Sequence, residues 1–180
     1  MQKQLSDAAL GAPDRGEAPL RLVVMGVSGA GKSTVGRALA DHLGVAFRDG
    51  DDFHSPENIA KMRAGQPLTD QDRWGWLGLI AQALHQDAPL VVAASALRSS
   101  YRDHLCAGAG GPVRFVHLSG PAHLIAARMS GRAGHFMPAQ LLESQFQTLE
   151  IPPPDAALAV PITLSVSEQV AMIAQSLAAP

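Results

Sequence analysis

The sequence predicts a three-layer α/β/α fold, in which helices cover both faces of a mostly parallel sheet of about five strands. Two patterns predict it: short apolar runs alternate with longer segments whose apolar residues recur at helical spacing. The runs are rich in β-branched residues, as is typical of strands buried on both faces. A third observation is size, because 180 residues with 47% hydrophobic content suit one domain with a sizeable core.

Each element follows from a local pattern. Strands are expected where the apolar runs lie, at residues 22–25, 45–48, 90–94, 113–118 and 161–166. Helices are expected at residues 33–43, 56–64, 99–107, 121–129, 138–149 and 168–177. A further, longer helix is capped by Thr69 or Asp70, and its apolar stripe runs from Trp74 to Leu84.

The chain is expected to form one domain at residues 21–180. Residues 1–20 are polar, rich in Ala, Gly, Pro and Asp, and show no sustained apolar period. Such a segment buries too little apolar surface to order itself. We therefore expect a disordered N-terminal extension ahead of the domain.

Composition excludes several classes of function. Fourteen basic residues against sixteen acidic ones give a net charge of −2, without a basic patch for nucleic acid. No apolar run reaches the roughly 18 residues that a membrane helix needs, and the N-terminus lacks the apolar core of a secretory signal. The single cysteine, Cys106, cannot form an internal disulfide. These observations favour the cytoplasm and predict neither a membrane nor a nucleic acid as partner.

A phosphate-binding loop follows the first predicted strand. The segment GVSGAGKS matches the pattern G-x-x-x-x-G-K-[ST] in full, and a helix follows it. Its glycines let successive N–H groups curl around phosphates, to which the helix N-terminus adds positive potential. Lys32 is placed to reach the β- and γ-phosphates, and the Ser33 hydroxyl to bind Mg²⁺. The predicted nucleotide-binding residues are Gly26, Val27, Ser28, Gly29, Ala30, Gly31, Lys32, Ser33 and Thr34.

This loop does not by itself distinguish a kinase from a GTPase or a motor. The sequence has no N-K-x-D segment to read guanine, and 180 residues leave little room for a motor. The third predicted strand ends in Ala93-Ala94-Ser95 without an acidic residue. The carboxylate that supports the metal must therefore come from elsewhere in the chain.

The acidic turn after the second predicted strand supplies two candidates. Asp49 and Asp51 are separated by Gly50, so their side chains point the same way if strand geometry persists. The carboxyl edge of a parallel sheet is where ligands bind. We assign Asp49 to the metal side and Asp51 to the acceptor, because phosphoryl transfer to an alcohol needs a group that receives its proton.

Together these stretches resemble the gluconate kinases, small P-loop enzymes similar to shikimate kinases. The resemblance spans residues 21–154 and rests on five stretches: MGVSGAGKST, DGDDFH, NIAKMRAGQPLTDQDRWGWL, SALRSSYRD and GHFMPAQLLESQFQTLEIP. It implies a P-loop kinase fold with a mobile lid at about residues 128–137. It also implies transfer of a phosphoryl group from ATP, with Mg²⁺, to D-gluconate, commonly by a homodimer.

The resemblance also assigns residues to the acceptor pocket. Asp51 and His54 lie in the DGDDFH stretch, Arg73 precedes the first tryptophan, and Ser95 and Arg102 lie in SALRSSYRD. Arg102 is our candidate for the substrate carboxylate, because a guanidinium pairs with a carboxylate through two hydrogen bonds. Whether the cations Lys61, Arg63 and Arg98 contact the substrate remains open.

Two arginines of the predicted lid, Arg128 and Arg132, resemble those that close over the transferred phosphoryl group in this kinase group. With Lys32 and Asp51 they complete the predicted catalytic set. The sequence departs from the family pattern at Gly75, where Pro is frequent, and at Ala133, where a lid lysine is frequent. These departures bear on pocket shape and lid stability rather than on the reaction.

Two alternatives remain open. The first is a related small-molecule kinase such as a shikimate kinase, against which DGDDFH and SQFQTLE argue. The second is a regulatory module that binds ATP without turnover. That second alternative would need the acceptor carboxylate or the lid arginines to be missing, and Asp51, Arg128 and Arg132 are all present.

Overall fold

The computed structural model of the chain describes residues 18–130 and 139–179. Five strands form one sheet in the order β2-β3-β1-β4-β5, and every neighbouring pair is parallel. The strands are β1 (Arg21–Met25), β2 (Ala46–Asp49), β3 (Leu90–Ala93), β4 (Arg114–Ser119) and β5 (Leu158–Pro161). The predicted parallel α/β fold is confirmed.

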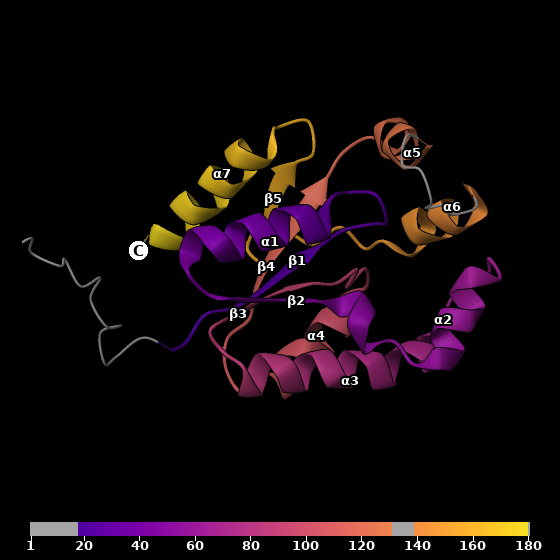
Figure 1. The fold of residues 1–180 in the computed structure, drawn as a ribbon, viewed down its shortest axis with the longest axis horizontal. Helices are drawn as coiled ribbons and strands as arrows, with labels where there is room; N and C mark the ends of the chain where they lie inside the picture. The colour runs from indigo at the N-terminus through magenta and orange to yellow at the C-terminus, as the bar shows by residue number, and fades with distance from the viewer. Residues whose placement is uncertain (1–17, 131–138, 180) are drawn as a thin grey trace, which may run out of the picture.

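Helices flank this sheet on both faces (Figure 1). In chain order they are α1 (Lys32–Leu43), α2 (Pro56–Arg63), α3 (Asp70–Gln86), α4 (Ser99–Gly108), α5 (Ala122–Ser130), α6 (Ala139–Thr148) and α7 (Val166–Ala178). Helices α1 and α7 cover one face, and α3 and α4 cover the other. The three layers expected from the sequence are therefore present.

Alternation along β1 shows how one apolar run supplies two cores. Leu22 and Val24 pack in the cluster that includes Leu39 of α1. Val23 and Met25 pack in the other cluster, with Leu77 of α3. Because side chains of a strand point alternately to its two faces, a central strand must be apolar at every position.

The last strand lies earlier than predicted, and the expectation of a strand at residues 161–166 is wrong. β5 pairs with β4 over Leu158–Pro161, and α7 already begins at Val166. A capping box fixes that helix start, because Ser165 accepts from the Glu168 N–H and the Glu168 carboxylate accepts from the Ser165 N–H. This signal was available in the sequence as Ser-x-x-Glu.

The start of the described chain is tied to the sheet. The Leu20 carbonyl accepts from the Leu90 N–H at 2.9 Å, and the Arg21 guanidinium donates to the Pro19 carbonyl at 3.0 Å. Most of the predicted N-terminal extension, residues 1–17, lies outside the described residues. Within the described ranges, no helix is both long and apolar enough to cross a membrane.

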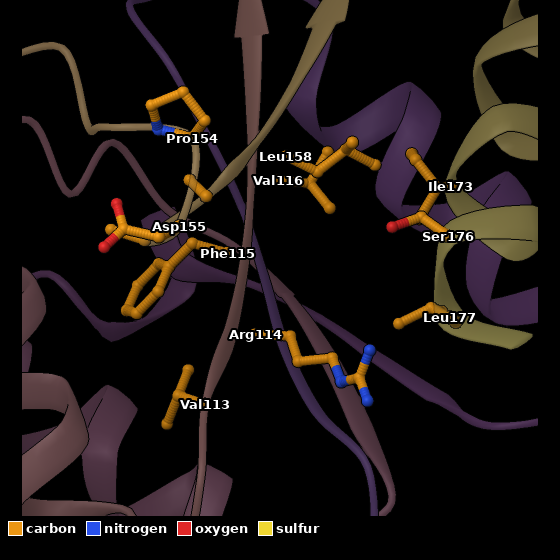
Figure 2. Close-up of a pocket in the computed structure, with 12 residues that line it drawn as sticks. Val113, Arg114, Phe115, Val116, Pro154, Asp155, Leu158, Ile173, Ser176 and Leu177 are labelled. Carbon is orange, nitrogen blue, oxygen red and sulfur yellow. The ribbon is translucent and has the colours of Figure 1, made fainter. Parts of the chain in front are cut away.

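A cavity of about 310 Å³ opens at the amino ends of β4 and β5 (Figure 2). Arg114 and Asp155 are its charged lining residues. Because the phosphate-binding loop follows the carboxyl end of β1, this cavity lies at the opposite edge of the sheet. It is therefore separate from the candidate active site.

Candidate active site

The phosphate-binding loop connects β1 to α1, as its motif predicts. Gly31 is the N-cap of α1, and no side chain caps this helix, which leaves its first N–H groups available to an anion. Gly29 has a φ of 80°, and a Cβ there would lie 2.5 Å from Met129 Cγ of α5. Only glycine fits where the loop passes under α5.

Lys32 lies inside this loop. Its ammonium donates to the Val27 carbonyl at 3.1 Å. Burial lowers the pKa of Lys32, and the carboxylates of Asp51 and Asp49 oppose that shift. The end of β3 connects the acidic turn with the phosphate-binding loop: Gly50 packs on the Ala93 carbonyl, and the Ser95 carbonyl accepts from the Gly26 N–H.

The acidic turn is built differently from the strand extension that we expected. β2 ends at Asp49, and Gly50–Phe53 form the single 3-10 turn η1, so strand alternation does not reach Asp51. Asp49 Oδ1 instead accepts from the Asp51 N–H at 3.1 Å. Asp51 remains exposed while Asp49 is half-buried. The two carboxylates share the turn but have different surroundings.

Two contacts hold this turn against the sheet. A Cβ on Gly50 would lie 2.4 Å from the Ala93 carbonyl oxygen, so the backbone of η1 sits directly on the end of β3. Trp76 of α3 donates from Nε1 to the Gly50 carbonyl at 2.6 Å. This hydrogen bond connects the turn to α3.

His54 follows the turn and stacks on Trp76, with ring centroids 4.6 Å apart and 8° between the planes. Burial lowers its pKa, Asp51 opposes the shift and Arg73 adds to it. Its Nδ1 is buried and has no hydrogen-bond partner among the described residues. A buried polar atom without a partner is rare in a folded protein, and a hydrogen bond to a ligand would account for it.

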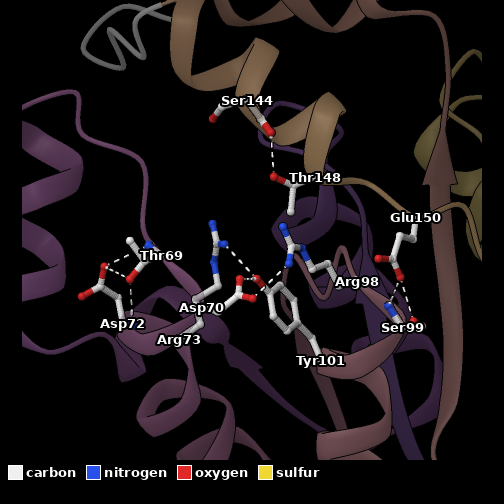
Figure 3. Close-up of polar contacts among 10 residues, drawn as sticks. All are labelled: Thr69, Asp70, Asp72, Arg73, Arg98, Ser99, Tyr101, Ser144, Thr148 and Glu150. Atoms are coloured by element: carbon white, nitrogen blue, oxygen red, sulfur yellow. Dashed lines mark hydrogen bonds and ion pairs between the residues drawn. The ribbon is translucent and has the colours of Figure 1, made fainter.

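A polar cluster formed by residues of α3 and α4 and of the segment before α4 orients Arg73 (Figure 3). Its Nη1 donates to the Tyr101 hydroxyl at 3.1 Å, and that hydroxyl donates to Asp70. Asp70 also pairs with Arg98 at 2.9 Å. Sequence reasoning missed Asp70 and Tyr101, because nothing local indicates that residues 31 positions apart meet.

Arg102 is buried and points to the backbone. Its Nη1 donates to the carbonyls of Ala96 and Leu97, at 3.0 and 3.2 Å. Ala96 has a φ of 43°, which is uncommon for a residue other than glycine, and the arginine supports the backbone at this point. This loop includes Ser95, whose carbonyl accepts from the Gly26 N–H at 3.4 Å. Arg102 thus stabilises the loop between β3 and α4, and its contact with substrate stays a prediction.

Of the lid predicted at about residues 128–137, the structure describes only residues 128–130. Arg128 lies in the last turn of α5 and donates to the Ile162 carbonyl. With Gly29, Thr34 and Gln169 it lines a cavity of about 430 Å³ beside the phosphate-binding loop. Arg132 and the rest of the predicted lid, residues 131–137, lie outside the described residues.

The residues predicted to hold Mg²⁺ offer hard oxygen donors. Ser33 lies in the first turn of α1, and Asp49 ends β2. Within the described part of the chain, no group of three His, Cys, Asp or Glu side chains forms a metal cage. Mg²⁺ is commonly bound through one or two carboxylates plus substrate phosphates, so this sparse donor set fits it.

Comparisons with known proteins show which family the chain belongs to. A family model described as an AAA domain matches residues 22–152. The chain is 44% identical to the probable gluconokinase of Mus musculus, over 89% of this chain and 99% of that protein. It is 48% identical to the gluconokinase of Gluconobacter oxydans, over 76% of this chain and 79% of that one. The chain belongs to the gluconokinase family.

Solved structures support this membership. A gluconokinase from Sinorhizobium meliloti is 46% identical and superposes with a TM-score of 0.79, over 88% of this chain and 95% of that one. A shikimate kinase from Aquifex aeolicus reaches a TM-score of 0.58 at 17% identity, so it shares the fold alone. Gluconokinase relatives thus match both the sequence and the fold, whereas the shikimate kinase matches only the fold.

Proposed function

We propose that the protein is a gluconokinase, which transfers the γ-phosphoryl group of ATP to a hydroxyl of D-gluconate and releases 6-phosphogluconate and ADP. The observation that carries the proposal is the meeting of a complete phosphate-binding loop with the acidic turn. Gly50 of the turn packs on the Ala93 carbonyl at the end of β3, and Ser95, which follows β3, accepts from the Gly26 N–H of the loop. Identity of 44% over nearly the whole length of a probable gluconokinase supports the choice of acceptor.

The loop provides the nucleotide side of the site. Backbone N–H groups at the start of α1 bind the phosphates, and Lys32 neutralises charge that develops on the leaving ADP. The cavity of about 430 Å³ borders the loop at Gly29 and Thr34 and extends to Ser165 at the start of α7. Its position fits the nucleoside part of ATP.

The acceptor occupies the side of the acidic turn. Asp51 receives the proton of the attacking hydroxyl, whose oxygen forms the new bond to phosphorus while the bond to ADP breaks. His54 presents its buried Nδ1 to a substrate hydroxyl. Arg73, held by Tyr101, offers a cation to the gluconate carboxylate.

Two other cations pair with carboxylates, whereas the partner of Arg73 is a neutral hydroxyl. Lys61 pairs with Asp72 at 2.6 Å and ties α2 to α3. Arg98 pairs with Asp70. These pairs make Arg73 our first choice for the substrate carboxylate, and Arg102 keeps that role only if its guanidinium also reaches the pocket.

Ser33 and Asp49 would hold Mg²⁺, whose charge would offset that of the phosphates. We further propose that the enzyme acts as a homodimer in the cytoplasm. Light scattering tests the first part of that proposal. A homodimer gives a mass twice the 18.8 kDa of one chain, and a single-chain mass would contradict it.

A coupled assay of ADP release tests the function. The purified protein is given ATP and Mg²⁺ with gluconate, shikimate, glucose or no acceptor. We expect ADP release with gluconate well above that with the other acceptors, and mass spectrometry should find phosphogluconate. Preference for shikimate would replace the proposal with the alternative kinase, and ATP binding without turnover on any acceptor would favour a regulatory module.

A further inference from the structure

Gln145 of α6 makes a long-range contact with the phosphate-binding loop. Its Oε1 accepts from the Ser28 N–H at 2.6 Å, across 117 positions of sequence. Gln145 belongs to the SQFQTLE stretch, to which the sequence assigned no chemistry. The contact places a neutral acceptor on the backbone of the loop that binds phosphate.

The Ser28 N–H belongs to the Val27–Ser28 peptide, whose carbonyl group also accepts hydrogen bonds. The peptide between Val27 and Ser28 contributes the carbonyl that accepts from Lys32 Nζ at 3.1 Å and from the Ala30 N–H at 3.3 Å. In a trans peptide the carbonyl and the N–H point in opposite directions. Lys32 therefore holds this unit from inside the loop, and Gln145 holds it from the α6 side.

Because Lys32 and Gln145 contact opposite sides of the peptide, Gln145 does not simply occupy the position of a phosphate. A group in the phosphate position would lie on the same side as Lys32. The Lys32 ammonium has three N–H donors and shares them with phosphates when nucleotide binds. Gln145 is then the contact that keeps the peptide from turning over.

The segment that presents Gln145 is fixed at its far end. Residues 145–150, here termed the α6 strap, end at Glu150, whose carboxylate accepts from the N–H and the hydroxyl of Ser99, both at 2.7 Å (Figure 3). The Glu150 N–H donates to the Leu97 carbonyl at 2.9 Å. Phe146 and Leu149 pack on the core. The strap thus connects the phosphate-binding loop to the start of α4.

We propose that Gln145 is a positioning residue, which holds the Val27–Ser28 peptide in the orientation that the nucleotide requires. The proposal rests on the proposed kinase function. Without this contact, the Val27–Ser28 peptide is flipped in a fraction of the molecules. Only the remaining molecules bind nucleotide, so the apparent affinity falls in proportion to their share. Loss of one hydrogen bond that leaves a polar group unpaired predicts an effect of about five- to twentyfold.

The first test compares Gln145→Met with Gln147→Met. Methionine keeps the length of the side chain and removes the acceptor oxygen. Gln147 is exposed on the same helix, and its side chain donates a hydrogen bond to Glu143 at 3.5 Å, so it is a matched control. Calorimetry with a non-hydrolysable ATP analogue should give a Kd raised about five- to twentyfold in Gln145→Met and unchanged in Gln147→Met. The KM for gluconate should stay within about twofold, and hydrogen exchange at the Ser28 amide should accelerate in Gln145→Met alone.

The second variant, Gln145→Glu, retains an acceptor oxygen and adds a negative charge near the phosphates. At 1 M salt, where the screening length is about 3 Å, its analogue affinity should return to within about threefold of wild type, measured at the same salt. Gln145→Met should not recover. If Gln145→Met does not fold, Gln145→Glu alone decides. Because its carboxylate can still accept from the Ser28 N–H, rapid hydrogen exchange at the Ser28 amide in that variant would contradict the proposal.

The outcomes separate two kinds of failure. Analogue binding by Gln145→Met at wild-type affinity overturns the positioning role, and tighter binding means that Oε1 competes with a phosphate. Failure of the wild-type protein to bind the analogue at all contradicts the proposed function instead. Loss of affinity together with a comparable loss in the gluconate KM would assign Gln145 to general stability and overturn the inference.

Discussion

At the scale of single residues, Lys32 is the charge on which the proposed transfer depends most. Lys32→Ala removes the group that neutralises charge on the leaving phosphates, so we expect kcat to fall about a hundredfold or more. The variant also loses the hydrogen bond to the Val27 carbonyl. Initial rates of ADP release, with circular dichroism to check folding, test this expectation.

Lys61→Ala is the matched control. Lys61 pairs with Asp72 outside the loop, and its replacement should leave kcat within a few-fold of wild type. A folded Lys32→Ala protein with turnover near wild type would rule out the assignment of the phosphate-binding loop.

Asp49 and Asp51 differ in surroundings, and we expect their variants to differ in kind. Asp51→Asn removes the group that receives the acceptor proton, so kcat should fall about a hundredfold or more while affinity for nucleotide changes little. Asp49→Asn should raise the Mg²⁺ concentration needed for half-maximal rate. Rates across a magnesium titration, read beside calorimetry with a nucleotide analogue, measure both effects. If Asp49→Asn lowers kcat and Asp51→Asn changes the Mg²⁺ requirement, the two roles are interchanged. If both variants behave like wild type, the acidic turn has only a structural role.

At the scale of elements, the loop between β3 and α4 depends on Arg102. Arg102→Ala leaves the carbonyls of Ala96 and Leu97 without this donor in a buried position, so the free energy of unfolding should fall by about 2–4 kcal/mol. Arg98→Ala, which breaks a partly exposed pair with Asp70, should lower it by less than about 1 kcal/mol. Urea unfolding gives both values. If Arg102→Ala instead keeps wild-type stability and raises the KM for gluconate, Arg102 binds the substrate carboxylate.

The element η1 depends on α3 through one hydrogen bond. Trp76→Phe keeps an aromatic ring beside His54 but removes the donor to the Gly50 carbonyl, so we expect a loss of about 1–3 kcal/mol in stability. Because Gly50 lies between the two aspartates, kcat/KM for gluconate should fall as well. Trp74→Phe is the control, since Trp74 contacts Tyr101 edge-on and is half-buried. Equal effects of the two changes would mean that ring size, rather than the hydrogen bond, positions the turn.

At the scale of the whole molecule, four helices have a hydrogen-bonded carboxylate at their N-terminus. Carboxylates at the N-termini of α2, α3, α4 and α7 accept nearby hydrogen bonds, which hold the pKa of Glu57, Asp72, Glu150 and Glu168 below their usual values. For Asp72 the pKa falls to about 2, chiefly through its hydrogen bond with Lys61. A pKa depressed by folding stabilises the protein above the unfolded value and loses that effect as pH falls through the folded one.

The protein should therefore lose stability as pH falls below about 4.5, the usual range of these groups. We expect the urea midpoint to drop between pH 7 and pH 3, and to drop less in the double variant Asp72→Asn, Glu168→Gln, whose amides do not titrate. Glu143→Gln, on the exposed side of α6, should follow wild type. A wild-type midpoint that is equal at pH 7 and pH 3 would contradict this account.

The sequence by itself determined the parallel sheet, the helices around it and the position of the phosphate-binding loop. These features are encoded locally, because strand runs, helical periods and the glycines of the loop each act through neighbours in the chain. Even the misplaced strand at residues 161–166 had a local signal in Ser165 and Glu168, whose capping box starts α7. The family resemblance came from the same short stretches.

Only the tertiary structure decided where long polar side chains point. Arg102 turns to two backbone carbonyls, Tyr101 joins Asp70, and Gln145 reaches Ser28 across 117 positions. Such side chains have many rotamers of similar energy, and the partner that selects one is brought close only by the packing of distant elements. The local sequence around each residue therefore carries no record of its contact.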